Sequence, residues 1–382
     1  MAHIAFYSTN TELPWGESED LWSQAAQRLL QWGHTVSISY KRWRDETPAP
    51  LEALEAQGGR LSLRHPLWRR VQRWVDVPAA VKPFLPAVRW LRRQAPDLVI
   101  ISVSYHTDTL AVAAACQRQG VPYALLLHCV SREDGWPEHE EQRYRRAYEQ
   151  AACCFFVSHE NRRIIEEKIT ASLPQATVVS NPLGVRPDAP LLWPSDNDNG
   201  DENGPRFACV GQMHFRQKAQ DVILRVLRRD KWRNRSLQVR FFGSNQGNRK
   251  QFEALIRRYG LEGHVRYAGY AERACIWRTC HGLLLPSRFE GMPMVTPEAM
   301  ACGRVPVVTR CGRNPDLVTD AETGFLAEAA TERLVDRALE RAWQRRSEWE
   351  QMGRRAAQHV RDGYDDDPVG TFTQRLIECS PA

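Results

Sequence analysis

The sequence predicts an α/β protein built from two doubly wound domains in succession. Short apolar runs of strand length alternate with segments whose apolar residues recur at helical spacing, which indicates strand–helix–strand units. This alternation occurs twice along the 382 residues, once on each side of a polar, acidic stretch, and the length suits two ordinary domains. Parallel sheets are expected, because strand–helix–strand connections join parallel neighbours.

The first half opens on a buried strand and continues with a helix. Leu21, Ala25 and Leu29 lie on one face of that helix, and Gly33 ends it, as glycine does just past a helix. Asn181-Pro182 marks a turn near the end of this half. Buried strands are expected at 3–8, 35–39, 98–102, 123–127, 155–157 and 177–180, with helical segments between them.

A linker separates the halves. Residues 186–205 are polar, acidic and glycine-bearing, so we assign 1–185 to a first domain and 206–361 to a second. Doubly wound sheets bind ligands at the carboxyl ends of their strands, so we expect a site in a cleft between the domains. In the second domain, strands are expected at 207–210, 239–242, 265–267, 282–285 and 305–309, and helices at 221–227, 249–259 and 298–302.

The composition limits the protein class and its surroundings. No apolar run approaches the roughly 20 residues of a membrane span, and the N-terminus does not resemble a signal peptide. The ten cysteines include no CxxC and no Cys/His pairing at zinc spacing. Cys153-Cys154 lies in an apolar run, so we expect buried free thiols and a reducing cytosol. A net charge of +6 weakly favours phosphate-bearing or membrane-surface partners, and we expect no nucleic-acid partner.

The segment from 285 to 308 carries most of the candidate chemistry. A strand ends at Ser287, Glu290 follows in a loop, and Thr296 and Pro297 are expected as helix N-cap and first helical residue. Glu298 then falls in the first turn. One acid can bind ribose hydroxyls while the other faces a sugar; alternatively, each merely favours a helix start. The backbone expected to face an anion belongs to Gly291, Met292, Pro293, Met294 and Val295.

This segment resembles the E-x7-E signature of family-4 (group 1) retaining glycosyltransferases, which have the GT-B fold of two Rossmann-like domains facing a central cleft. The likeness continues through 299–303, 309–317 and 323–327. It implies that Glu298 binds the ribose and that Glu290 contacts the sugar of a nucleotide diphosphate sugar. The segment 362–382 resembles the last helix of that family, which returns to the first domain.

A second motif, residues 210–221, resembles the family's other donor-binding motif. A diphosphate leaving group needs its developing charge neutralised, and Lys218 is expected to supply a point charge. Gln212 stands where the family has arginine, with Arg216 as possible compensation, and Ala219 stands where it has glycine. A solvated surface lysine is the alternative for Lys218. Gly243 resembles a backbone-approach position near the phosphates, and Tyr270 the position that meets the nucleobase.

In the first half, Gly16 resembles the family's N-terminal glycine loop, whose second glycine is Glu17 here. His128, at a strand end, resembles the cleft histidine that faces the donor sugar; a hydrogen-bonded structural histidine is the alternative. His106 is a weaker candidate of the same kind, and His34 is expected to be structural.

The resemblance implies metal-independent, retaining transfer of a sugar to a glycan or lipid-linked acceptor. The nucleotide diphosphate sugar serves as co-substrate, with no other cofactor and no metal. The protein is expected to act in the cytoplasm, in the synthesis of a cell-surface polysaccharide or a glycolipid. Two alternatives remain: a non-catalytic nucleotide-sugar-binding or partner subunit, which Gln212 and Glu17 would suit, and a sugar-nucleotide epimerase, which the E-x7-E loop does not suggest.

The segment 60–95 is strongly basic and suggests contact with an anionic membrane at its inner face. An interfacial helix is predicted from an apolar stripe opposite a basic face; a core-packing helix with a solvated basic face is the alternative. A second helix, with Phe84, Val88 and Leu91 on one face, is expected to pack in the core. The predicted stripe comprises Leu67, Val71, Trp74 and Val75, with Trp68 at its edge and Arg69, Arg70 and Arg73 opposite.

Overall fold

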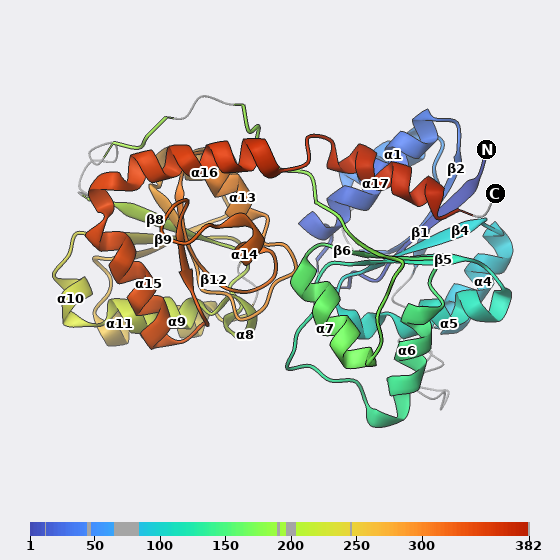
Figure 1. Ribbon diagram of the computed structural model, residues 1–382, viewed down its shortest axis with the longest axis horizontal. Helices are drawn as coiled ribbons and strands as arrows, with labels where there is room; N and C mark the ends of the chain where they lie inside the picture. The colour runs from blue at the N-terminus through green and yellow to red at the C-terminus, as the bar shows by residue number, and fades with distance from the viewer. Residues whose placement is uncertain are drawn as a thin grey trace. The chain divides into compact units, whose positions relative to one another are not determined.

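The computed structural model describes residues 1–11, 13–43, 47–64, 84–188, 192–195, 204–244 and 247–380. They form two compact units (Figure 1). The first comprises Met1–Pro182 and Asp365–Ala382, and the second comprises Leu183–Tyr364. Each unit has one parallel sheet flanked by helices, so the predicted α/β class is confirmed.

The first unit contains a seven-stranded sheet in the order β3-β2-β1-β4-β5-β6-β7. The order reverses between β1 and β4, which is the point where doubly wound sheets bind ligands. The strands are β1 (His3–Ser8), β2 (Thr35–Lys41), β3 (Arg60–Arg64), β4 (Leu98–Val103), β5 (Tyr123–Leu127), β6 (Cys153–Phe156) and β7 (Ala176–Val178). The helices are α1 (Asp20–Gln31), α2 (Ala49–Ala56), α4 (Phe84–Gln94), α5 (Leu110–Gln119), α6 (Glu141–Glu149), α7 (His159–Ile169) and α17 (Pro368–Glu378), with 3-10 turns η1 (Glu17–Glu19), η2 (His106–Asp108) and η3 (Glu138–Glu140).

Alternating side chains of the first sheet build two separate cores. Ile4 and Phe6 of β1 pack in the core that also holds α1 and α17, while Ala5 and Tyr7 face the core on the α4 and α5 side. The alternation follows from the two-residue period of a strand. Helix α17 therefore belongs to the first unit, where Phe372 contacts Phe155 edge to face at 5.1 Å.

The second unit contains a six-stranded sheet in the order β10-β9-β8-β11-β12-β13, again with cores on both faces. Its strands are β8 (Arg206–Val210), β9 (Gln238–Phe242), β10 (Val265–Gly269), β11 (Gly282–Leu285), β12 (Val305–Thr309) and β13 (Phe325–Ala327). Its helices are α8 (Phe215–Lys218), α9 (Gln220–Leu227), α10 (Asp230–Arg233), α11 (Arg249–Tyr259), α12 (Arg273–Thr279), α13 (Val295–Ala301), α14 (Asn314–Leu317), α15 (Glu332–Gln344) and α16 (Trp349–Gly363), with the 3-10 turn η4 (Arg346–Glu348).

The unit boundaries differ slightly from the predicted ones. The first unit ends at Pro182, three residues before the predicted limit of 185, and its returning segment begins at Asp365 rather than 362. The described part of the predicted linker is attached to the second unit: Trp193 packs against a core there, and Arg206 donates to the carbonyl of Ser195 at 2.5 Å. Residues 196–203 lie outside the described part.

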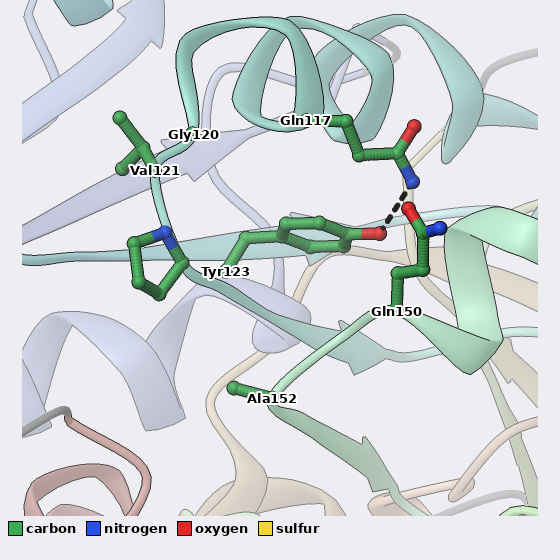
Figure 2. A pocket seen from close by; sticks show the side chains of 7 residues that line it. Gln117, Gly120, Val121, Tyr123, Gln150 and Ala152 are labelled. Carbon is green, nitrogen blue, oxygen red and sulfur yellow. Dashed lines mark hydrogen bonds between the residues drawn. The ribbon is translucent and has the colours of Figure 1, made fainter.

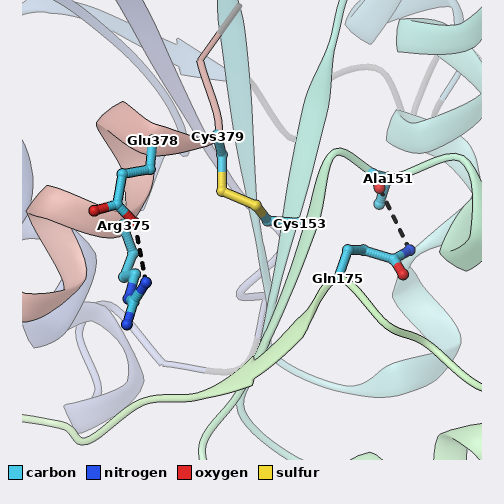
Figure 3. Close-up of a disulfide and its surroundings, with 6 residues drawn as sticks. All are labelled: Ala151, Cys153, Gln175, Arg375, Glu378 and Cys379. Atoms are coloured by element: carbon cyan, nitrogen blue, oxygen red, sulfur yellow. Dashed lines mark hydrogen bonds and ion pairs between the residues drawn. A yellow bond between two sulfur atoms is a disulfide. The ribbon is translucent and has the colours of Figure 1, made fainter.

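A disulfide corrects the expectation that Cys153 is a buried free thiol. Cys153, the first residue of β6, is bonded to Cys379, just past α17, with their Cα atoms 6.2 Å apart (Figure 3). Cys154 and the other seven cysteines are free thiols. The pair is 226 residues apart in sequence and meets because α17 folds back on the first unit, which spacing alone does not reveal.

The basic segment 60–95 is described only in part. Residues 60–64 form β3 rather than a helix, and the predicted amphipathic stripe from Leu67 to Val75 lies outside the described residues. In α4, Val88 and Leu91 are buried in the core as expected, and Arg89 is exposed. None of the helices described is both long enough and apolar enough to cross a bilayer.

Candidate functional site

Two predicted site residues meet in the second unit. Glu290 follows β11 in a loop and is 5% exposed, and its Oε1 accepts a hydrogen bond from Lys218 Nζ at 2.6 Å. The same oxygen accepts from the hydroxyl of Ser287 at 2.7 Å. Within the described chain, no group donates to the other oxygen, Oε2. Glu290 is therefore fixed through one oxygen and presents the second.

Lys218 is held by its position at the end of α8. The side chain of His214 caps that short helix by accepting from the amide of Gln217, and the Lys218 side chain is 18% exposed. Its contact with Glu290 does not fit the alternative of a solvated surface lysine. Ala219 follows with φ +51°, a left-handed conformation that suits glycine better. The replacement of glycine noted in the sequence thus falls at a position with a steric reason for glycine.

The loop after Glu290 offers backbone donors. The amides of Gly291, Met292, Met294 and Val295 pair with no acceptor in the described part of the chain, so they are available to an anion. Pro293 has no N–H, so its backbone cannot donate as the sequence prediction implied.

Helix α13 starts two residues earlier than predicted. Its first residue is Val295 and its N-cap is Met294, which makes no side-chain capping bond. Thr296 is therefore not the N-cap; it is fully buried and its hydroxyl donates to Asn314 Oδ1 at 2.9 Å. That tertiary bond satisfies the threonine hydroxyl, so the hydroxyl does not cap the helix.

Glu298 has protein partners on both carboxylate oxygens. Arg273 Nε donates to Oε2 at 2.7 Å, and the amide of Gly184 donates to Oε1 at 3.2 Å. The residue is 1% exposed. These tertiary contacts go beyond favouring a helix start. A ribose hydroxyl can reach this carboxylate only by adding to, or replacing, one of these donors.

The turns that end β8 and β9 are in close contact. Gly243 has φ +138°, and a Cβ there would lie 2.0 Å from the carbonyl oxygen of Gly211. The amide of Gly243 donates to the carbonyl of Gly269 at 2.9 Å. Only glycine fits such an approach, so this contact within the protein explains the glycine by itself, and the expected approach of Gly243 to a phosphate stays a prediction. Tyr270, beside this turn, is 87% exposed.

The two residues expected to supply polar or cationic contacts near Lys218 differ in setting. Gln212 is half-buried, and its backbone carbonyl accepts from the side chain of Gln220 at 2.6 Å. Arg216 lies in α8 and is exposed. Arg216 and Lys218 thus bring two cations to one short helix.

His128, in the first unit, is a buried neutral imidazole. It is 7% exposed at the carboxyl end of β5, and Nε2 lies 3.1 Å from the hydroxyl of Ser102. Burial lowers the pKa of His128 to about 3, and Nδ1 has no partner among the described groups. An unpaired buried nitrogen costs about 1–3 kcal/mol, so a purely structural role leaves this nitrogen unexplained.

The other two histidines named in the sequence analysis, His106 and His34, form hydrogen bonds with backbone groups. His106 Nε2 lies 3.0 Å from the carbonyl of Asp134, and burial lowers its pKa to about 4. His34 accepts from the amide of Ala2 at 3.2 Å through Nδ1, the structural role expected of it.

The glycine loop of the first unit differs in detail from the expectation. Gly16 has an extended backbone, and a Cβ there would meet nothing closer than Ser18 Oγ at 3.7 Å, so sterics do not demand glycine. Glu17 is exposed. Sequence reasoning missed Glu19, the last residue of η1, which is fully buried and accepts from Trp22 Nε1 at 3.0 Å. Burial raises the pKa of Glu19 to about 7.

Ser287 was named only as a strand end, and its bond to Glu290 was also missed. The serine lies three residues before the acid, which is a weak signal because the bond depends on the loop conformation. The signal for Glu19 was equally local: Trp22 follows three residues later, on the same helical face.

A cavity of about 340 Å³ lies elsewhere in the first unit (Figure 2). It lies at the amino ends of β5 and β6, away from His128, and Tyr123 in its wall donates to the carbonyl of Ala147 at 2.7 Å. None of the predicted site residues lines it. The lining residues are Gln117, Gly120, Val121, Pro122, Tyr123, Gln150 and Ala152.

Each half of the chain matches a family model. Residues 204–344 match the family model described as glycosyl transferases group 1, and residues 21–186 match the model described as glycosyltransferase family 4. Each model covers less than half of the chain, and together they show that both parts are similar to glycosyltransferase domains.

Relatives with detectable sequence identity match only part of the chain. An uncharacterized glycosyltransferase of Methanocaldococcus jannaschii is 37% identical over 82 residues, which cover 21% of this chain and 23% of that protein. Glycogen synthase of Alkalilimnicola ehrlichii is 33% identical over 171 residues, 41% of this chain and 34% of the relative. The chain thus matches between about a quarter and a third of the length of these relatives.

Solved structures match nearly the whole chain in fold. HepE of Anabaena, in complex with UDP, superimposes with a TM-score of 0.72 at 17% identity and covers 98% of both chains. Sucrose-phosphate synthase of Thermosynechococcus elongatus gives a TM-score of 0.74 at 15% identity, covering 99% of this chain and 98% of the other. These matches confirm the predicted GT-B fold.

Proposed function

We propose that this chain transfers a glycosyl group from a nucleotide diphosphate sugar to a glycan or lipid-linked acceptor, with retention of anomeric configuration. The observation that carries the proposal is the Lys218–Glu290 pair beside the unpaired amides of four following residues: Gly291, Met292, Met294 and Val295. The lysine cation suits the diphosphate, and the carboxylate suits the hydroxyls of the sugar. The backbone N–H groups suit the negative charge that develops on the leaving diphosphate.

The proposed reaction breaks the bond between the anomeric carbon and the diphosphate oxygen and forms one to an acceptor oxygen. The acceptor proton passes to the departing diphosphate on the same face. Glu290 is already bound through Oε1 to Lys218 and Ser287, which suits orientation and charge stabilisation better than nucleophilic attack. Retaining glycosidases instead use a second carboxylate as nucleophile.

The low pKa of His128 supports a role as a neutral hydrogen-bonding group. A neutral imidazole can donate through one ring nitrogen and accept through the other. Its unpaired Nδ1 is sealed from solvent, so in the proposed reaction a sugar hydroxyl reaches this nitrogen only when the surrounding side chains move.

Metal independence is part of the proposal. Lys218 and the amides of the 291–295 loop neutralise the negative charge on the leaving diphosphate. A divalent cation has this role in other transferases. Lys218 is a compact, strongly hydrated point charge suited to phosphate oxygens.

Uridine diphosphate sugars are the first donors to test, because HepE has been crystallised with UDP and with UDP-glucose. Purified protein is incubated with a panel of nucleotide sugars, and release of nucleoside diphosphate is measured with and without candidate acceptors. Glu290→Ala and Lys218→Ala serve as inactive controls. Thermal shift with each donor identifies the preferred nucleotide, since ligand at 100 times its dissociation constant adds about 2.7 kcal/mol of stability.

A non-catalytic nucleotide-sugar-binding subunit is the second candidate. Gln212 favours it, because glutamine supplies no charge where the resembling family has arginine. The thermal shift and turnover assays separate the two functions: a donor that stabilises the protein without hydrolysis or transfer, under any acceptor tested, supports the binding subunit.

We also propose a cytoplasmic site of action at the inner face of a membrane, in polysaccharide or glycolipid synthesis. The support is the basic segment 60–95, whose exposed members include Arg89, Arg92 and Arg93. Co-sedimentation with anionic liposomes at low and high salt tests this. Each basic residue near anionic lipid contributes about 1 kcal/mol, so a triple change of Arg69, Arg70 and Arg73 to Glu is expected to abolish binding at low salt. Absence of binding by the unaltered chain would indicate a soluble acceptor.

A further inference from the structure

We infer that Ser287 is a positioning residue: its hydroxyl fixes Glu290 through Oε1, so that Oε2 is the oxygen that meets the donor sugar. This inference rests on the proposed function and specifies how that site is arranged. Because a carboxylate oxygen only accepts hydrogen bonds, the sugar group that it meets is a hydroxyl or an amide N–H rather than another carboxylate.

The two oxygens of Glu290 are unequal. Oε1 accepts from Ser287 Oγ at 2.7 Å and from Lys218 Nζ at 2.6 Å. Oε2 receives no hydrogen bond from the described chain, yet it is not sealed from solvent as the buried unpaired atoms of the protein are. An accessible carboxylate oxygen with no protein partner is the natural acceptor for a ligand hydroxyl.

Ser287 itself is immobilised from the neighbouring strand. It is fully buried, and its carbonyl accepts from the hydroxyl of Thr309, at the end of β12, at 2.5 Å. The thiol of Cys311 also donates to that carbonyl at 3.4 Å. Strands β11 and β12 pair in parallel up to Leu285 and Val308, so these bonds continue the pairing past the strand ends. The serine hydroxyl therefore projects from a fixed backbone.

Ser287 and Lys218 have different roles once a nucleotide sugar is bound. A diphosphate attracts Lys218 strongly, because its charge exceeds that of one carboxylate, so the ammonium is drawn towards the phosphates. The hydroxyl of Ser287 is neutral and buried, and the diphosphate does not compete for it. Ser287 thus keeps Glu290 in place at the stage when Lys218 turns to the leaving group.

The test compares Ser287→Ala with Ser287→Thr, which keeps the hydroxyl. Ser287→Ala is expected to lower kcat by about tenfold to a hundredfold, the scale of a small misplacement of a reacting group. It should leave the affinity for UDP, which lacks the sugar, within twofold of wild type. Ser287→Thr should recover most of kcat. The matched control is Thr373→Val, which removes another fully buried hydroxyl, one that donates to the carbonyl of Val369 at 2.6 Å in the first unit; its kcat should stay near wild type.

Three solution results would each overturn the inference. The first is a kcat of Ser287→Ala within twofold of wild type. The others are a loss of UDP affinity in Ser287→Ala as large as its loss of kcat, and a loss of kcat in Thr373→Val as large as that in Ser287→Ala. Crystals of the unliganded wild type and Ser287→Ala give a readout independent of turnover. The carboxylate of Glu290 is expected to shift in the alanine variant, and an unchanged position would refute the positioning role whatever the activity. Wild type without any transfer or hydrolysis, but with the carboxylate shifted in Ser287→Ala, would refute the proposed function and leave the contact standing.

Discussion

The buried carboxyl group of Glu19 should make the first unit less stable at alkaline pH. Its hydrogen bonds from Trp22 and Ser18 do not fully offset burial, which raises its pKa from 4.5 to about 7. The folded protein then binds more protons than the unfolded chain between these two pH values. The stabilising contribution of this group is present below pH 4.5 and is lost as the pH rises through about 7.

The magnitude follows from the two pKa values. At 1.36 kcal/mol for each tenfold change in the acid constant, the interval from 4.5 to about 7 corresponds to about 3 kcal/mol. Integrated between pH 5 and pH 8, Glu19 should remove about 2–3 kcal/mol of stability. His128 and His106 act in the opposite direction at lower pH, because burial lowers their pKa values to about 3 and about 4. A difference between two variants is therefore needed to isolate Glu19.

Glu19→Gln keeps the shape of the side chain but cannot ionise. Native-state hydrogen exchange of α1 and β1 amides, measured by mass spectrometry, reports the free energy of opening in this region. Relative to wild type, the variant should gain about 2–3 kcal/mol between pH 5 and pH 8. Glu17→Gln, which changes an exposed acid two residues away, should show almost no change with pH. A difference for Glu19→Gln that stays constant within about 0.5 kcal/mol over this range would refute the reasoning.

Three further predictions concern the second unit. Lys218→Ala should lower turnover by roughly 10²–10³-fold, the scale for losing one preorganised donor to developing charge; steady-state kinetics with turnover within twofold of wild type would disprove its role. Glu298→Gln should weaken binding of the nucleoside diphosphate by about 1.5–3 kcal/mol in calorimetric titration, because a charge-assisted hydrogen bond is lost. It should also lower the melting temperature, since Arg273 loses its charged partner. Unchanged affinity would leave Glu298 a purely structural acid. Activity should survive EDTA, and loss that magnesium or manganese restores would contradict the metal-free mechanism.

Much of the fold was predictable because each strand carries its own apolar run. β5, for example, begins and ends at the predicted residues 123 and 127. Lys218 and Glu290 were both selected through motifs, but their mutual contact joins residues 72 apart and depends on how α8 packs beside the loop after β11. Burial of Glu19 was not predictable, since an acid at a helix start is usually solvated. The start of α13 was misplaced because a favourable N-cap residue, Thr296, was engaged by a tertiary partner instead.

The bond between Cys153 and Cys379 turns most of the chain into a covalent ring. The polypeptide leaves the first unit at Pro182 and re-enters it at Asp365, so the entire second unit lies inside this ring. A protease that cuts once anywhere in the second unit produces two pieces that the disulfide keeps joined. They migrate as one band in a denaturing gel until a reductant is added. The second unit is thus an insertion whose two attachment points are secured by the same crosslink, and a nick in it does not release either terminal piece of the first unit.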